Sequence, residues 1–320
     1  MSEWRVPTFA DVLAARRRIA AHLRPTPLFG YPALDELLDA QVHVKHENHQ
    51  PVGAFKVRGG VNLVAQLSDD ERERGLITAS TGNHGQSVAF AARRFGVSAR
   101  ICVPERPNPV KLAAMEGLGA ELIVGGADFD DARENAERLA AEHGYRYVHS
   151  GNEPHLIAGV ATETLEIVEE QPDVDVVIVP VGGGSGAAGA CIAAKAINPA
   201  IRVIAVQSDA APAAYRTWKE GRPVEAECRT SAEGLATRVP FGLPQQILRE
   251  HLDDFVLVSE EQIKAAQRTM IEATRNLVEA SGASPLAAAL KLRDALRGRR
   301  VALVASGGNV SPAQLLELLA

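Results

Sequence analysis

The chain has few of the residues that mark secreted, metal-binding or membrane proteins. Only three of its 320 residues are cysteines, Cys102, Cys191 and Cys228, and none belongs to a C-x-x-C pair. This usage predicts neither a disulfide framework nor a zinc site, and it is typical of a reducing compartment. No apolar segment is long enough to span a bilayer, and the first residues lack the basic and apolar regions of a signal peptide. We therefore expect a cytoplasmic protein with no membrane contact and no structural metal.

Long basic runs are also missing. The longest is Arg16 to Arg18 and the net charge is −6, so the sequence argues against a nucleic-acid partner. Aromatic residues are scarce at 4%, whereas hydrophobic residues make up 46% of the chain, which is enough to bury a large core at this length. The composition is typical of an α/β enzyme with a small-molecule substrate and two lobes.

From about residue 75, short apolar segments alternate with segments of helical periodicity. Repeats of this length predict parallel, doubly wound sheets with right-handed crossovers. Strands are predicted at 42–46, 76–79, 100–103, 121–124, 174–181, 203–207, 255–258 and 301–305. Helices are predicted at 8–24, 34–38, 59–67, 84–95, 109–118, 128–143, 156–170, 260–280 and 285–296.

Capping residues and connectors complete this prediction. Thr8 with Asp11 forms an expected capping pair, and Asn108 is an expected N-cap. Residues 69–74 are predicted to be an exposed connector, and 209–244 an irregular segment that lines a site. We expect a large domain from 1–74 and 151–320, to which the resemblance described below assigns the binding of a cofactor, and a small domain from 75–150.

Lys56 lies among apolar neighbours, directly after the turn from Pro51 to Gly53. An exposed lysine is a hydrated cation, but a desolvated one loses its proton more easily and can form an imine with a carbonyl. A solvated lysine on a helix explains this stretch equally well when it is taken alone. Other loops therefore have to decide between the two interpretations.

Three further loops follow predicted strands, where α/β folds bind ligands. The glycine run 182–186 offers backbone N–H groups at a helix N-terminus, which suits a phosphate. The turn 80–84 gathers hydroxyls and an amide, which suits a carboxylate, and Ser306 can hydrogen-bond a ring nitrogen. Each loop also has a plain structural interpretation, as a tight turn or as a helix cap.

The glycine run has a second functional interpretation. Gly184, Gly186 and Gly189 satisfy G-x-G-x-x-G, and Asp209 follows about twenty residues later, as in the fingerprint of an NAD-dependent dehydrogenase. This alternative leaves Lys56 and the other two loops without a role. It also places the fingerprint in the middle of the chain, outside an opening βαβ unit. We therefore regard it as remote.

Together these segments resemble the fold-type II pyridoxal-phosphate enzymes, and within them the serine/threonine dehydratase (threonine ammonia-lyase) and serine racemase family. The resemblance covers nearly the whole chain. It rests on Thr26-Pro27-Leu28, Phe55-Lys56-Val57-Arg58-Gly59, the stretch from Ser80 to Gln86, Gly182-Gly183-Gly184, Glu233-Gly234, Glu279-Ala280-Ser281-Gly282-Ala283 and Ser306-Gly307-Gly308-Asn309. It implies a two-lobed α/β fold of the tryptophan synthase β type, with the cofactor between the lobes, and a homodimer.

The resemblance also implies roles for single residues. Lys56 would carry pyridoxal 5'-phosphate as an internal aldimine and then act as general base. Asn83 would contact the ring hydroxyl oxygen and Ser306 the ring nitrogen. The remaining cofactor contacts would come from Phe55, Gly182, Gly183, Gly184, Ser185, Gly186, Gly234 and Glu279. The substrate carboxylate would bind Ser80, Thr81, Asn83 and His84, and the hydroxyl of Thr81 would be a second catalytic group.

The implied activity is loss of the β-hydroxyl from a 3-hydroxy amino acid of the L-threonine/L-serine class, giving a 2-oxo acid and ammonia in amino-acid catabolism. Serine racemase and 3-hydroxyaspartate dehydratase are the alternatives on the same scaffold. Racemisation stays open because Thr81 keeps a hydroxyl where racemases of this branch commonly carry serine, and 3-hydroxyaspartate stays open because the sequence does not determine which 3-hydroxy amino acid is preferred. Cysteine synthase and threonine synthase fit less well, since they carry a different lysine motif. Glu233 replaces the usual aspartate, so a divalent cation at this acid is only a weak prediction. The chain length leaves no room for the regulatory domain of biosynthetic threonine deaminases.

Overall fold

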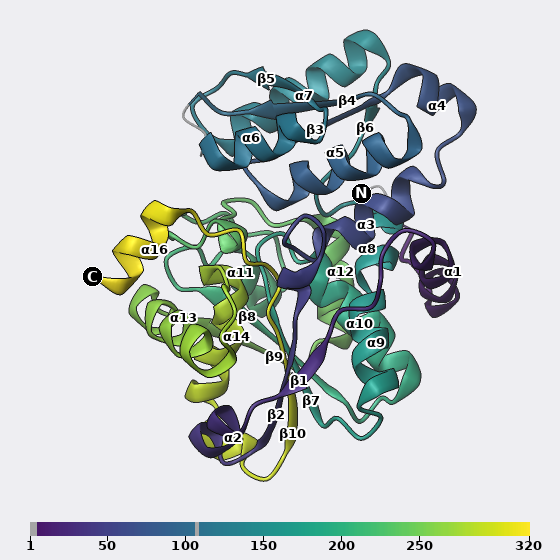
Figure 1. The fold of residues 1–320 in the computed structure, drawn as a ribbon. Coiled ribbons are helices and arrows are strands. Elements are labelled where there is room, and N and C mark those ends of the chain that lie inside the picture. The colour runs from purple at the N-terminus through teal and green to yellow at the C-terminus, as the bar shows by residue number, and fades with distance from the viewer. Residues whose placement is uncertain (1–4, 106–108) are drawn as a thin grey trace.

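The computed structural model describes residues 5–105 and 109–320 and places their strands in two sheets (Figure 1). The large sheet has six strands in the order β1-β2-β10-β7-β8-β9. Neighbouring strands are parallel except β1 and β2, which pair antiparallel at one edge. Its strands are β1 (Leu28–Gly30), β2 (Gln41–Lys45), β7 (Val176–Pro180), β8 (Arg202–Ser208), β9 (Asp254–Val258) and β10 (Arg300–Val304).

The small sheet has four parallel strands in the order β5-β4-β3-β6. They are β3 (Leu76–Ala79), β4 (Ala99–Val103), β5 (Glu121–Val124) and β6 (Arg146–Tyr147). In Figure 1 this sheet and its helices form the upper part of the molecule, and the large sheet lies below them. The predicted α/β fold with doubly wound, mainly parallel sheets is confirmed.

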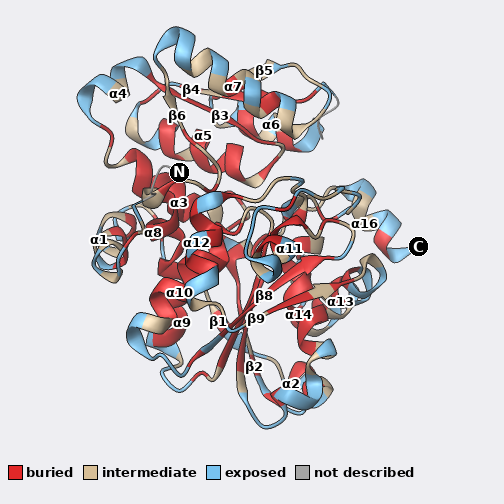
Figure 2. Ribbon diagram, turned by 180° about the vertical axis from the view of Figure 1, so that it is seen from behind, coloured by how far each residue is buried: buried red, intermediate tan, exposed pale blue. Residues whose placement is uncertain are grey.

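Helices cover both faces of the large sheet, and Figure 2 shows their inner faces and the central strands buried. One hydrophobic cluster joins the sheet to α1, α8, α9, α10 and α12, and another joins it to α2, α13 and α14. Both faces of the sheet are therefore covered, as parallel sheets require. The helices are α1 (Phe9–Ala20), α2 (Pro32–Leu38), α3 (Lys56–Val64), α4 (Asp69–Arg74), α5 (Asn83–Phe95), α6 (Pro109–Gly117), α7 (Phe129–His143), α8 (Pro154–Val160), α9 (Thr162–Glu170), α10 (Ser185–Ile197), α11 (Ala213–Glu220), α12 (Gly242–His251), α13 (Glu260–Thr274), α14 (Ala280–Lys291), α15 (Arg293–Leu296) and α16 (Pro312–Leu319).

Several local predictions are confirmed. Thr8 and Asp11 form a capping box at the start of α1. The strands β3 and β5 have the predicted bounds, and α7 ends at the predicted residue. The expected cap at Asn108 lies outside the described residues.

Other local predictions are wrong, each for an identifiable reason. Residues 69–74 form a short helix, because Ser68 and Glu71 make a capping box that stabilises its first turn. The predicted helix 260–280 ends at Thr274, because Arg275 adopts a left-handed conformation. Pro285 lies inside α14 and does not begin it.

The remaining differences concern irregular segments and helix starts. The segment 209–244 contains the whole of α11, the short 3₁₀ turn Glu233–Leu235 and the start of α12. The predicted helix 156–170 is two helices that meet at Ala161. Lys56 is itself the first residue of α3, which begins three residues earlier than predicted. The short strand β6 was not predicted.

Candidate active site

A cavity of about 980 Å³ lies between the large sheet and the small sheet. Its walls come from the loops after β7, β10 and β3 and from the starts of α3 and α7. The carboxyl ends of parallel strands are the usual ligand site of open α/β sheets. Every site residue proposed from the sequence lines it: Phe55, Lys56, Ser80, Thr81, Asn83, His84, Gly182, Gly183, Gly184, Ser185, Gly186, Gly234, Glu279 and Ser306.

Lys56 points from the first turn of α3 into this cavity. Its Nζ donates to Ser185 Oγ at 2.7 Å and to the carbonyl oxygen of Ser150 at 3.1 Å. The surrounding protein removes water from the amine and lowers the pKa of Lys56 to about 8, from its ordinary 10.5. Among the residues that the structure describes, no carboxylate is hydrogen-bonded to the amine to oppose this shift. A neutral, nucleophilic amine is therefore far more accessible here than on an ordinary lysine.

The position of α3 is set by tertiary contacts, since its own start is weak. Phe55 precedes the helix and provides no side-chain cap. Two adjacent glycines let neighbouring segments approach closely: a Cβ on Gly59 would lie 2.7 Å from Leu156, and one on Gly60 would lie 2.4 Å from Ser87 Oγ. The helix that carries Lys56 is thereby held between α5 and α8.

A buried cluster of charged side chains fixes the first turn of the same helix through Arg58. Arg58 is fully buried and makes two hydrogen bonds to Glu47 and two to Glu166, each of 2.7 Å. Lys45, also fully buried, donates to Glu166 at 2.7 Å. Buried charges are stable only when each finds partners of opposite sign, which this arrangement supplies. Arg58 thus fixes the turn that begins with Lys56.

Glu163 is a third carboxyl in this cluster. It is buried, and its Oε2 has no hydrogen-bond partner among the described residues. Burial, together with the negative charges of Glu47 and Glu166, raises the pKa of Glu163 well above its ordinary value. Its surroundings therefore favour the neutral form of Glu163 over the charged one.

The glycine loop after β7 forms a cradle of backbone N–H groups at the start of α10. Gly184 has φ +91°, a left-handed conformation that favours glycine. A Cβ on Gly182 would lie 2.3 Å from the carbonyl oxygen of Gly234, and one on Gly183 would lie 2.1 Å from the ring of Phe241. The loop is therefore closed against the opposite wall. The helix N-terminus and the hydroxyl of Ser185 suit a phosphate beside Lys56.

The loop 80–84 presents the start of α5 to the same cavity. Ser80 Oγ accepts from the N–H of Gly82 at 3.1 Å and from that of Gly85 at 2.8 Å, so its oxygen holds the turn in shape. The backbone N–H groups of Asn83 and His84 lie in the first turn, where a helix has no internal partner for them. This turn therefore suits a carboxylate.

The imidazole of His84 has a structural part in this loop. Its Nε2 lies 2.9 Å from Thr78 Oγ1, which donates to the carbonyl oxygen of Val148 and so accepts from the ring. Burial, assisted by the nearby charge of Lys56, lowers the pKa of His84 to about 3. The ring is neutral at physiological pH. The contact of His84 with a substrate carboxylate stays a prediction, and the backbone N–H at the start of α5 is the group suited to make it.

The loop after β10 is joined to the segment that precedes Lys56. Ser306 is buried, and its carbonyl oxygen accepts from the N–H of Phe55 at 3.0 Å. The N–H of Gly308 donates to the carbonyl oxygen of Gly53 at 2.9 Å. These backbone contacts bring Ser306 to the cavity wall beside Lys56, although the two residues lie far apart in the sequence.

The sequence analysis missed the ion pairs that cross this cavity. Lys111 of α6 pairs with Glu233 of the opposite wall. Arg238 pairs with Asp130 at 2.8 Å and with Asp128 at 3.2 Å, at the start of α7. All five line the cavity. No local pattern identifies such pairs, because the partners are more than a hundred residues apart.

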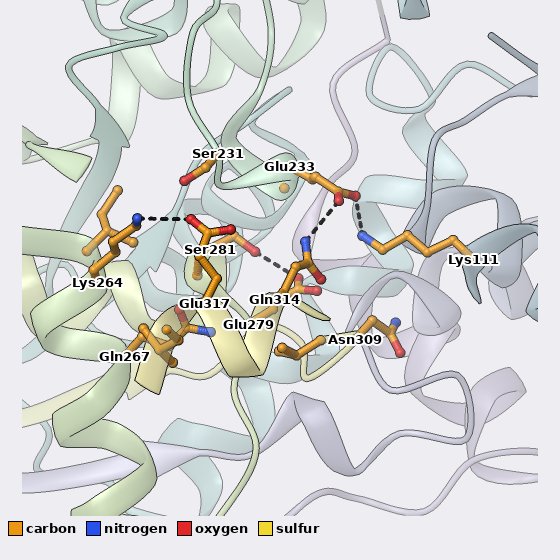
Figure 3. A pocket seen from close by; sticks show the side chains of 15 residues that line it. Lys111, Ser231, Glu233, Lys264, Gln267, Glu279, Ser281, Asn309, Gln314 and Glu317 are labelled. Atoms are coloured by element: carbon orange, nitrogen blue, oxygen red, sulfur yellow. Dashed lines mark hydrogen bonds and ion pairs between the residues drawn. The ribbon is translucent and has the colours of Figure 1, made fainter. Parts of the chain in front are cut away.

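A smaller chamber of about 130 Å³ adjoins the cavity and shares the wall formed by Glu233, Glu279 and Ser281 (Figure 3). Both oxygens of Glu233 are engaged there, one by Lys111 and the other by Gln314 Nε2 at 3.2 Å. Among the described residues, no group of three or more His, Cys, Asp or Glu side chains is placed to hold a metal ion. A divalent cation at Glu233 is only a weak prediction from the sequence. In the structure, the cation beside this carboxylate is the ammonium group of Lys111.

The dinucleotide alternative uses the same loop in a different way. β7, the glycine loop, α10 and β8 form a βαβ unit, so the motif has a suitable setting. Gly189, however, packs inside the protein, where its Cβ would lie 2.9 Å from the backbone of Ala161. The dinucleotide interpretation gives no role to Lys56, whose amine donates directly into the loop at Ser185.

Comparison with known proteins identifies the arrangement. The family model described as "Pyridoxal-phosphate dependent enzyme" matches residues 19–307. The L-threonine ammonia-lyase of Thermotoga maritima is 39% identical over 304 residues, which cover 95% of this chain and 76% of that protein. The L-threo-3-hydroxyaspartate ammonia-lyase of Saccharomyces cerevisiae is 35% identical over 306 residues, covering 95% and 94%. The solved structure of maize serine racemase has a TM-score of 0.93 and 30% identity, and covers 98% of this chain and 97% of that one.

In the part of the chain that the structure describes, no helix combines the length and the apolar character needed to cross a membrane.

Proposed function

Because the chain belongs to the family of pyridoxal-phosphate dependent enzymes, we propose that it is an ammonia-lyase acting on a 3-hydroxy amino acid of the L-threonine/L-serine class. The reaction removes the β-hydroxyl and gives a 2-oxo acid and ammonia. The observation that carries this proposal is the position of Lys56, whose amine lies in the cavity and donates to Ser185 of the glycine loop. The dehydrogenase alternative gives no role to this amine, and the relatives described above are named as ammonia-lyases and a racemase.

The cavity suits pyridoxal 5'-phosphate. Its chemistry needs a lysine that can lose its proton, a phosphate cradle and a donor for the ring oxygen. Lys56 has its pKa lowered to about 8, the start of α10 offers N–H groups, and Asn83 lines the same wall. Further contacts would come from Phe55, Gly182, Gly183, Gly184, Ser185, Gly186, Gly234, Glu279 and Ser306.

When bound, the cofactor withdraws electrons from the α-carbon of the amino acid, which makes loss of the α-proton feasible. The N–H groups at the start of α5 and the hydroxyls of Ser80 and Thr81 bind the α-carboxylate and so orient the substrate. Lys56 Nζ then accepts the α-proton as general base, which requires a neutral amine. The electron pair left on the α-carbon expels the β-hydroxyl, which takes up one proton and leaves as water, so that the proton gained by Lys56 and the proton consumed balance. One water then hydrolyses the released enamine, by way of its imine, to the 2-oxo acid and ammonia.

Two related substrates or outcomes stay open on this site. A 3-hydroxyaspartate dehydratase is supported by the 35% identity to the yeast enzyme of that name. Racemisation is supported by the hydroxyl of Thr81, which lines the cavity and offers a second proton-transfer group. Elimination from a substrate of the L-threonine class is preferred, because the ammonia-lyase of Thermotoga maritima, at 39% identity, is more similar in sequence than the yeast enzyme at 35% or the maize serine racemase at 30%.

The organisation of the molecule belongs to the same proposal. We take the small sheet and its helices, residues 75–150, as one domain, and residues 1–74 with 151–320 as the other. The two sheets and the cavity between them support this division. A homodimer and a cytoplasmic location are further parts of the proposal.

Purified protein tests the activity directly. We expect a visible absorbance band from the bound cofactor, and release of ammonia and 2-oxo acid from L-threonine, L-serine or threo-3-hydroxyaspartate. The Lys56→Ala variant should lose the band and at least about 10³-fold of the turnover, since general base catalysis and covalent attachment depend on the same amine. D-amino acid as the main product would assign a racemase. A stable visible band with no product from any of the three substrates would contradict the ammonia-lyase.

A further inference from the structure

We propose that Asn309 is a positioning residue that fixes the side-chain amide of Asn83, so that Asn83 presents an N–H, and not its oxygen, to the cofactor ring. This inference rests on the proposed function only for the place of the cofactor. Asn309 belongs to the Ser306-Gly307-Gly308-Asn309 motif, of which only Ser306 had an assigned role. It lies on the wall of the small chamber in Figure 3, close to Glu279.

The amide of Asn309 has both of its N–H groups engaged. Its Nδ2 donates to the backbone oxygen of Val52 at 2.9 Å and to Asn83 Oδ1 at 2.8 Å. An amide nitrogen carries two hydrogens, so these two acceptors use its donor capacity completely. Asn309 therefore connects the segment before Lys56 with the first residue of α5.

Glu279 selects the same orientation of Asn83 from the other side. Asn83 Nδ2 donates to Glu279 Oε1 at 2.8 Å, and that oxygen also accepts from Ser281 Oγ at 2.7 Å. Turning the amide of Asn83 by half a turn would place its oxygen against Glu279 Oε1 and its nitrogen against the nitrogen of Asn309. Both contacts would become repulsive, so the observed orientation is the one that both neighbours stabilise.

This leaves one hydrogen of Asn83 Nδ2 for the cavity. The nitrogen carries two hydrogens and Glu279 takes one of them. The free hydrogen is the only donor that the Asn83 side chain can offer to a ring oxygen. Without Asn309, only Glu279 would hold the Asn83 amide, so its oxygen would face the ring for a larger share of the time.

Two glycines make room for this arrangement. Gly53 has φ +67°, and a Cβ there would lie 2.6 Å from Asn309 Oδ1. A Cβ on Gly307 would lie 2.7 Å from Glu279 Oε1 and 3.2 Å from Asn83 Nδ2. The bare backbone at both positions allows the three polar side chains to meet beside Ser306.

A hydrogen-bond donor at the ring oxygen should stabilise the negative charge on that oxygen. The oxygen should then attract the proton on the cofactor-bound Lys56 nitrogen less strongly. Loss of the donor should then raise the pH at which this nitrogen loses its proton, by about one pH unit, a tenfold change in proton affinity. The visible absorbance band reports this protonation without any turnover.

The experiment titrates the visible band of the cofactor-loaded protein with pH and records its thermal unfolding. We expect N309A to raise the midpoint in the same direction as N83A and by no more, because Glu279 still holds Asn83 from the other side, and we expect the double variant N309A/N83A to match N83A alone. N309D keeps the shape of the side chain but replaces the donor by an acceptor facing Val52 and Asn83, so it should raise the midpoint at least as far. Gln314→Ala, which lines the same chamber without contacting Asn83, is the matched control and should keep the wild-type midpoint.

Several results would overturn the inference. A wild-type midpoint in both N309A and N309D would do so, even with lowered thermal stability, because Asn309 would then be structural only. Additive shifts in the double variant would show that Asn309 does not act through Asn83, and an unshifted N83A would remove the premise. If the N309A variant did not retain the cofactor, the pH titration of the N309D variant would provide the test. A wild-type protein with a normal band but no ammonia release contradicts the proposed activity alone, so the two failures can be told apart.

Discussion

At the scale of single residues, the site depends on how the fold changes ordinary side chains. Lys56 has no acidic hydrogen-bond partner within residues 5–105 and 109–320, and it lies where the protein excludes water, so its proton is held weakly. His84 is neutral for the same reason, and its ring stabilises the loop 80–84 through a hydrogen bond with Thr78. The two effects have one cause, since burial disfavours the charged form of each group.

The lowered pKa of Lys56 predicts how the apoprotein takes up its cofactor. Imine formation needs the neutral amine, and a lysine pKa of about 8 means that this form grows as the pH rises through 8. The rate at which the visible band appears after addition of pyridoxal phosphate should rise about tenfold per pH unit below 8 and level off above it. Stopped-flow absorbance across pH 6 to 10, with a simple alkylamine as reference, provides the measurement. A midpoint near the ordinary lysine value of 10.5 would contradict the prediction.

At the scale of the elements, α3 begins with the lysine and is held by parts of the chain far from it. Its start is uncapped and contains two adjacent glycines, which are poor helix formers. Arg58 compensates by connecting the first turn to Glu47 and to Glu166 of α9. The ionic cluster therefore stabilises the position of the helix more than any property of the helix itself.

The charges in this cluster predict that substitutions of two nearby acids, Glu166 and Glu163, change the unfolding free energy by different amounts. Glu166→Gln removes a charge that two cations share, and breaking a buried ion pair costs about 3–5 kcal/mol of unfolding free energy. Glu163→Gln replaces a carboxyl whose neutral form is favoured by burial, so we expect it to change the unfolding free energy by less than about 1 kcal/mol. Urea unfolding at pH 7 compares the two variants, with each serving as the control for the other.

The pH dependence of stability gives a second check on Glu163. Because its pKa is raised in the folded protein, the folded state binds this proton more tightly than the unfolded state does. Its contribution is fully present below the ordinary pKa of 4.5 and is lost as the pH rises toward the folded value. The Glu163→Gln variant should remove that part of the pH dependence. Equal destabilisation by both substitutions at pH 7 would show that Glu163 is ionised.

At the scale of the whole molecule, the two sheets meet across the cavity through side chains of opposite charge. Arg238 reaches Asp128 and Asp130 at the start of α7, and Lys111 reaches Glu233. Arg238 is half exposed and therefore contributes little to global stability, whereas Lys111 is buried. The exposed pair is the weaker connection between the two parts of the molecule.

This difference predicts a local effect for Arg238→Ala. The unfolding free energy should fall by no more than about 1 kcal/mol, as is usual for exposed ion pairs. Amide hydrogens at the start of α7 should exchange severalfold faster, because the cavity loses a contact across its mouth. Hydrogen exchange followed by mass spectrometry provides the measurement. Arg138→Ala, which removes a pair with Glu142 within the same helix, is the control and should leave that exchange unchanged.

The sequence by itself determined the sheet-forming segments and the loops that carry the proposed chemistry. These signals are local: apolar runs mark buried parallel strands, and the residues directly after them lie at the ligand-binding edge. Lys56, the loop 80–84 and the glycine run could be selected for that reason, and the structure brings them to one cavity. Helix ends were less accurate, because the left-handed Arg275 and the capping of α4 depend on details that periodicity does not contain.

Only the tertiary structure decided which groups act on these residues. The protonation of Glu163, the anchoring of Lys56 through Arg58, and the orientation of Asn83 by Asn309 all depend on partners far away in the sequence. Hydrogen bonds and desolvation act over a few ångströms of space, whatever the separation along the chain. A residue's type can therefore be read from the sequence, whereas its charge state and the direction in which its amide points follow from the fold.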